Sequence, residues 1–122
     1  MKIERFDVNE RRSRLVKYNG MCFLSGQFSD KGGDVASQTR EVLSKIDELL
    51  ARAGTDKSRL LTAEVWITTM ADFDEMDAVW KAWVAPGNPP TRCCCAVQLG
   101  DPDMRVEIMV SAALGEVEMI EG

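Results

Sequence analysis

The stretch DVASQTREVLSKIDELLARAGTDKSRLLTAEVWIT, residues 34–68, decides the fold. Asp34 is a good N-cap residue and Gly54 is a good helix terminator, so the segment between them is predicted to be a helix that runs to about Ala53. Apolar residues recur there at steps of three and four, which gives one apolar stripe beside a charged face and favours packing on a sheet. The stripe consists of Val35, Val42, Leu43, Ile46, Leu49, Leu50 and Ala53. Apolar and polar residues then alternate from Leu61 to Thr68, as expected of a strand whose two faces differ.

Before this helix the chain is predicted to form a β-meander. Residues 2–6, 14–18 and 21–27 each have the composition of a short strand. Asn19-Gly20 separates the last two of these strands and is a strong signal for a tight hairpin turn. The fold is therefore expected to open with antiparallel strands.

After residue 68 the pattern predicts a second helix followed by two strands. Asp72 is placed to cap this helix, and Pro86-Gly87 prevents the helix from continuing. The helix has an aromatic and apolar stripe, for which core packing is the favoured interpretation: Phe73, Met76, Trp80 and Trp83. Residues 91–97 and 105–113 are predicted to be strands, joined by a turn at residues 100–103.

This order of elements is typical of an α+β fold with two helices on one face of a mixed sheet of about six strands. At 122 residues the chain is long enough for one domain, predicted to span residues 1–122, and too short for two. The two helices leave the other face of the sheet without a cover. Other copies of the chain would cover it most simply, so a closed homo-oligomer is expected.

Composition excludes several classes of function. Twenty acidic and fifteen basic side chains give a net charge of -5, which disfavours binding to nucleic acid. No apolar run is long enough to cross a bilayer, and the first twenty residues lack the apolar centre of a signal peptide. No membrane is therefore expected as a partner, and a cytoplasmic location is expected, in which the four cysteines stay reduced.

The sequence contains no histidine, so catalysis would depend on carboxylates, arginine, thiols, hydroxyls or the backbone. Side chains alternate along residues 91–97, which places Cys94 on one face and Cys93 and Cys95 on the other. The three cysteines cannot converge on one metal ion, so no metal site is predicted. Cys93 and Cys95 are interpreted as small core residues, and Cys94 as a buried thiol that a neighbouring guanidinium could make reactive.

One arginine and one glutamate stand out on the last two predicted strands. Arg92 follows the rigid approach Pro89-Pro90 and shares a face with Cys94. Glu107 lies opposite the apolar row of its strand, so it is expected to point away from the helices. The two residues could form a carboxylate-binding pocket with its own general base, or a structural ion pair, and spacing alone leaves both interpretations open.

Short segments spread over residues 14–113 carry a resemblance to a known family. They are Ser25-Gly26-Gln27, Gly33-Asp34-Val35 with Gln38-Thr39, Ala53-Gly54, Val65–Thr68 with Asp72-Phe73, Pro90-Thr91-Arg92-Cys93-Cys94 and Val106-Glu107-Ile108. The last two are the specific ones. In these segments the chain resembles the Rid family, the reactive intermediate or imine deaminases also called the YjgF group.

This resemblance implies a chorismate-mutase-like α+β fold assembled as a homotrimer, with three equivalent clefts between subunits. It implies that Arg92 holds the carboxylate of a small enamine or imine acid, and that Glu107 positions and activates the water that attacks the imine carbon. Ser25 and Cys94 match positions that line the cleft. The implied activity is a deaminase that releases 2-oxo acids and ammonia and needs no cofactor.

The chain also departs from the common pattern of this family. The basic stretch Arg11–Arg14 replaces a tyrosine expected before the second strand. Asp77 stands where an asparagine often follows the start of the second helix, and as a substrate-binding residue it would add negative charge to the pocket. Ala96 stands where an acid is common. A non-catalytic trimer that binds small carboxylates or partner proteins is the alternative function. An endoribonuclease, an activity attached to relatives, is disfavoured by the acidic balance and the missing histidine.

Overall fold

The apolar stripe of the first helix lies at the centre of the fold. In the computed structural model, which describes residues 1–122, helix α1 spans Val35–Ala53 and buries every residue of the predicted stripe. The Asp34 carboxylate caps it by accepting a hydrogen bond of 2.8 Å from the Ser37 N–H. Gly54 ends it in the left-handed conformation, with φ of 88°. Both predicted helix ends are confirmed.

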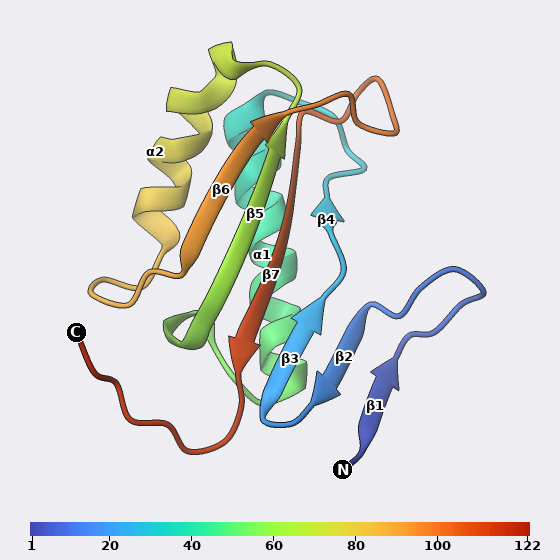
Figure 1. The fold of residues 1–122 in the computed structure, drawn as a ribbon. Coiled ribbons are helices and arrows are strands. Elements are labelled where there is room, and N and C mark those ends of the chain that lie inside the picture. Colours follow the sequence, from blue (N-terminus) through green and yellow to red (C-terminus); the bar gives the residue numbers. More distant parts are fainter.

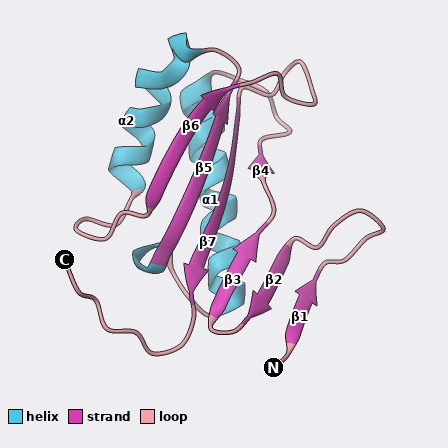
Figure 2. Ribbon diagram, in the orientation of Figure 1, coloured by secondary structure: helices cyan, strands magenta, loops and turns pink.

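The strands form one mixed sheet of seven strands, shown in Figure 1 and Figure 2. They are β1 (Ile3–Phe6), β2 (Leu15–Tyr18), β3 (Met21–Leu24), β4 (Gln27–Phe28), β5 (Leu60–Ile67), β6 (Thr91–Ala96) and β7 (Val106–Ala113). Their order is β1-β2-β3-β7-β5-β6, with β4 also paired to β7. Only β5 and β6 run parallel; all other pairs are antiparallel.

The N-terminal meander differs from its prediction at one point. Asn19 and Gly20 have φ of 52° and 75°, as the predicted tight turn requires. The third predicted strand, residues 21–27, is instead divided into β3 and β4. It is interrupted because the Ser25 N–H donates to the Arg14 carbonyl at 2.9 Å, away from β7. The sheet therefore has seven strands where about six were expected.

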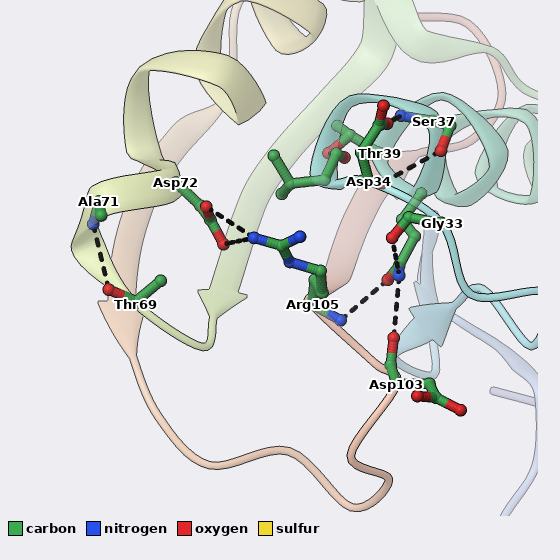
Figure 3. Close-up of polar contacts among 11 residues, drawn as sticks. Gly33, Asp34, Ser37, Thr39, Thr69, Ala71, Asp72, Asp103 and Arg105 are labelled. Atoms are coloured by element: carbon green, nitrogen blue, oxygen red, sulfur yellow. Dashed lines mark hydrogen bonds and ion pairs between the residues drawn. The ribbon is translucent and has the colours of Figure 1, made fainter.

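The second helix, α2, spans Phe73–Trp83 and follows a 3₁₀ turn at Met70–Asp72. The prediction that Asp72 caps this helix is wrong, because its side chain makes no capping hydrogen bond. Its two carboxylate oxygens instead accept hydrogen bonds of 3.0 and 2.9 Å from Arg105 Nη2 (Figure 3). Asp72 therefore ties the start of α2 to the segment that enters β7.

The core lies between the two helices and one face of the sheet. It consists of 20 buried apolar residues, drawn from α1, α2 and the inward positions of the strands. No helix is both long and apolar enough to cross a bilayer. The predicted α+β arrangement, with both helices on one face, is confirmed (Figure 1).

The opposite face of the sheet is open in the single chain. Phe23 and Phe28 lie on it and keep 43% and 39% of their accessible surface. Cys93 and Cys95 are also exposed, so their assignment to the core is wrong. They lie outside the core because β6 is the edge strand and their side chains point away from the helices. This face carries apolar surface that the chain itself does not cover.

A buried glutamine connects α1 to the start of β7. Gln38 is fully buried, and its Nε2 donates to the carbonyls of Gly33 at 3.0 Å and Asp103 at 2.9 Å. Its Oε1 accepts a hydrogen bond of 2.8 Å from the Arg105 N–H. Figure 3 shows these contacts beside the pair that Arg105 makes with Asp72. The segment that leads to Glu107 is thus held from both helices.

Replacing Gln38 by leucine is expected to lower the free energy of unfolding by about 3 kcal/mol, because three backbone groups lose their hydrogen-bond partner. Urea denaturation measures this loss. The matched control is Gln98→Leu, at an exposed position with no hydrogen bond from its side chain, and it should change stability by less than about 0.5 kcal/mol. Equal small effects in both variants would contradict the role given to Gln38.

Candidate functional site

Arg92 lies on the edge strand β6, and its side chain turns toward α2. Its Nη1 donates to Asp77 Oδ1 at 2.6 Å. The guanidinium carbon lies 5.7 Å from the ring centroid of Phe73 and 5.5 Å from that of Trp80. Although the Arg92 backbone follows the exposed edge, its side chain keeps only 24% of its accessible surface. One acid and two aromatic rings therefore fix this guanidinium.

Asp77 is the ion-pair partner of Arg92. The sequence alone also allowed an ion pair between Arg92 and Glu107, which the single chain does not form. The Asp77 side chain is 17% exposed. Its second oxygen, Oδ2, lies 3.7 Å from Lys81 Nζ, one turn further along α2. Asp77, one of the three departures from the family pattern, thus lies in direct contact with Arg92.

Cys94 shares the helix-facing side of β6 with Arg92 and is half-buried. Burial raises the pKa of its thiol, and the Arg92 cation opposes this shift without cancelling it. The predicted activation of Cys94 by its neighbour is therefore outweighed by burial. Nowhere in the structure are three histidine, cysteine or acidic side chains grouped so that they could hold a metal ion.

Glu107 lies on β7, with its side chain on the open face of the sheet. It is half-buried and takes part in no ion pair or side-chain hydrogen bond. Burial raises the pKa of its carboxyl group above the ordinary value. Gly26 packs directly against this carboxylate, and a Cβ atom at Gly26 would overlap Glu107 Oε2. Partial burial without a partner favours the protonated form of this carboxyl group, which is the state that suits a group exchanging protons with a ligand or water.

Ser25 precedes Gly26 and so belongs to the same part of the open face. The Gln27 amide donates to the Ser25 carbonyl at 2.9 Å and to its hydroxyl at 3.2 Å. Arg14 Nη2 in turn donates to Gln27 Oε1 at 3.3 Å. The basic stretch that departs from the family pattern therefore reaches the Ser25–Gln27 segment, which sequence reasoning did not foresee.

Arg92 and Glu107 lie on opposite faces of the sheet in one chain. On strand β5, which lies between β6 and β7, Ala63 is paired with Arg92, and Trp66 is paired with Glu107. Ala63 and Trp66 are three residues apart on β5, so their side chains point to opposite faces. In the single chain, burial is the cause of the raised pKa of Glu107, and Arg92 makes no contribution to the shift.

Two hollows of the single chain lie away from both residues. One, of about 620 Å³, is lined by residues 58–61, 87–89 and the C-terminal residues 117–121. Another, of about 530 Å³, lies between α1 and α2 beside Trp83 and Lys57. Neither includes Arg92 or Glu107. In the single chain the predicted site residues therefore form two separate groups, one around Arg92 with Asp77 and Cys94 and one around Glu107 with Ser25 and Gly26.

The raised pKa of Glu107 predicts how a variant changes stability with pH. Since the folded state favours the protonated carboxyl, Glu107 contributes stability below its unfolded pKa and loses that contribution as pH rises through its raised folded pKa. The Glu107→Gln variant, which stays neutral, should be more stable than wild type at pH 7, and the gain should vanish in acid. Urea denaturation between pH 4 and 8 checks this. A gain that is independent of pH would contradict it.

Comparisons with known proteins identify the family of the chain. The family model described as Endoribonuclease L-PSP matches residues 2–114. A RutC family protein of Haemophilus ducreyi is 44% identical over 113 residues, which cover 92% of this chain and 97% of that protein. A solved YjgF family structure from Neisseria meningitidis has a TM-score of 0.92 at 41% identity and covers 96% of this chain and 98% of its own. A solved Rid family protein from Yersinia pestis has a TM-score of 0.81 at 25% identity, covering 88% of this chain and 90% of its own. The chain therefore belongs to the YjgF/Rid family, whose model is described as Endoribonuclease L-PSP.

Proposed function

We propose that the protein hydrolyses small 2-imino acids, or their enamine tautomers, to 2-oxo acids and ammonia in clefts between copies of the chain. The observation that carries this proposal is the state of Glu107, a half-buried carboxyl with a raised pKa and no partner. A carboxyl group in that state suits general acid–base catalysis. A purely structural acid would be paired or solvated.

The clefts require more than one chain, because Arg92 and Glu107 lie on opposite faces of the sheet. A closed homotrimer supplies three equivalent clefts, in each of which Arg92 of one copy faces Glu107 of the next. The exposed Phe23 and Phe28 support this assembly, because another copy would cover them. The position of β6 at the edge of the sheet also supports it, since a second copy can approach Arg92 there.

In this cleft Arg92 holds the carboxylate of the substrate. Its Nη1 is already bonded to Asp77, but Nε and Nη2 remain to donate. Two donors on one edge of a planar guanidinium match the two oxygens of a carboxylate. Cys94, Asp77 and Ser25 line the cleft, with Cys94 in its protonated form because burial raises its pKa.

Glu107 carries the chemistry of the hydrolysis. The substrate reacts as its protonated imine. The ionised Glu107 carboxylate accepts a proton from a water molecule while the water oxygen bonds to the imine carbon and the second electron pair of the carbon–nitrogen bond moves to the nitrogen. The carboxyl then gives this proton to the nitrogen as the carbon–nitrogen bond breaks. Ammonia leaves, the hydroxyl group releases its proton to solvent, and the carbon–oxygen double bond forms. The reaction consumes one water and needs no redox partner.

The activity is tested with a 2-imino acid generated in the assay by an amino-acid oxidase, following 2-oxo acid release with and without the protein. Acceleration by the wild type supports the proposal. Binding of 2-oxo acids without acceleration would establish the non-catalytic carboxylate-binding function instead. Cleavage of RNA that survives rigorous removal of contaminating nucleases would establish the endoribonuclease, against the net charge of -5.

A further inference from the structure

We infer that Asp77 sets the charge selectivity of the Arg92 site, so that the site takes monocarboxylates with an uncharged or cationic side chain and disfavours dicarboxylates. This inference rests on the proposed function, because it concerns the ligand that Arg92 binds there. It starts from the ion pair between Arg92 and Asp77, whose closest atoms lie 2.6 Å apart.

Asp77 is the charged group closest to the Arg92 guanidinium. The two side chains keep 24% and 17% of their accessible surface, so water screens their charges less than it screens an exposed pair. Lys81 also contacts Asp77, at 3.7 Å, but its side chain is 72% exposed. The Asp77 charge is therefore fixed beside the place where a ligand carboxylate would bind, while the compensating Lys81 charge is largely solvated.

This arrangement affects two kinds of ligand differently. One carboxylate is still attracted, because Arg92 offers its free Nε and Nη2 and the group of Arg92, Asp77 and Lys81 has a net charge of +1. A second carboxylate on the ligand side chain is repelled by Asp77. At a separation of about 6 Å in a partly buried site, this repulsion costs at least a factor of ten in affinity. By the same argument, a ligand with a cationic side chain is attracted by Asp77 and binds more tightly.

The selective charge of Asp77 can be separated from its contact with Arg92. Asp77→Asn keeps an oxygen that can accept from Arg92 Nη1, and the rings of Phe73 and Trp80 still flank the guanidinium. This variant should therefore lose selectivity while keeping the geometry of Arg92.

Isothermal titration of the full-length protein with 2-oxopentanoate and 2-oxoglutarate tests the inference, since the two ligands differ in one terminal carboxylate. Wild type is expected to bind 2-oxopentanoate at least tenfold more tightly (about 1.4 kcal/mol). Asp77→Asn should reduce this ratio at least fivefold, mainly by tighter binding of 2-oxoglutarate. Glu75→Gln is the matched control, because it removes the same charge from an exposed position of α2 and should leave the ratio unchanged.

The outcomes separate this inference from the proposed function. Equal binding of both ligands by wild type overturns the selectivity of Asp77 but leaves the deaminase intact. An unchanged ratio in Asp77→Asn also overturns it, with circular dichroism confirming that the variant is folded. If wild type binds neither ligand and does not accelerate imine hydrolysis, the proposed function fails and this inference fails with it.

Discussion

The Glu107→Gln variant is expected to hydrolyse 2-imino acids about 100 to 10,000 times more slowly than wild type, the usual effect of removing a general acid–base group. The amide has nearly the shape of the carboxyl but neither accepts nor donates the catalytic proton near neutral pH. The dissociation constant of a 2-oxo acid should change little, because Glu107 acts on water and not on the ligand carboxylate. The loss should therefore appear in kcat and not in KM.

A neighbouring glutamate provides the control for this prediction. Glu64 lies on β5, opposite Met109, and is half-buried on the same face of the sheet as Glu107. Glu64→Gln should hydrolyse the imine at the wild-type rate. If Glu107→Gln and Glu64→Gln lose activity equally, the loss comes from removing a negative charge anywhere on the open face of the sheet. Glu107 would then have no specific role.

Replacing Arg92 by alanine is expected to weaken binding of a monocarboxylate such as 2-oxopentanoate by about 100-fold, because two charge-assisted hydrogen bonds are lost. Asp77 then keeps its negative charge without its main counterion, which adds to the loss. Isothermal titration gives the dissociation constant, and the same change should appear as a raised KM.

A lysine at this position distinguishes charge from geometry. Arg92→Lys keeps the positive charge but replaces the planar fork by a single ammonium, so its affinity should lie between those of wild type and Arg92→Ala. Wild-type affinity in Arg92→Ala would remove Arg92 from the site. Equal affinities in Arg92→Lys and wild type would show that only the charge of Arg92 is used.

The parts of the fold that the sequence predicted well are those that local patterns determine. Helix α1 follows from its cap, its stripe and its terminal glycine, and the turn at Asn19-Gly20 follows from the backbone conformations that these two residues favour. Strand β5 follows from alternation, and it does bury Ala63, Val65 and Ile67 against the helices.

The parts that were missed depend on which elements become neighbours. Cys93 and Cys95 were assigned to the core because alternation gives two faces to a strand but does not say that β6 is at an edge. Asp72 was expected to cap α2, but its carboxylate instead accepts hydrogen bonds from Arg105, which is distant in sequence. Both errors come from tertiary contacts that no local pattern contains.

The candidate site shows the same division between local and tertiary information. The sequence indicated Arg92 and Glu107, and alternation placed Glu107 away from the helices. Only the pairing of β5 with both β6 and β7 places Arg92 on the other face. The contact between Arg92 and Asp77 depends on where α2 packs. The sequence therefore indicated Asp77 as a site residue but did not identify Arg92 as its ion-pair partner.

Mixing two inactive variants tests the account most directly, because a site shared between copies can be restored by exchange of subunits. At substrate concentrations below the wild-type KM, where the raised KM of Arg92→Ala limits its rate, Arg92→Ala and Glu107→Gln should each be nearly inactive alone. Unfolded and refolded together in equal amounts, they should recover about a quarter of the wild-type activity, because about a quarter of the clefts then combine an intact Arg92 from one copy with an intact Glu107 from another. Activity that stays at the level of the separate variants, although mixed oligomers have formed, would contradict a site built across copies.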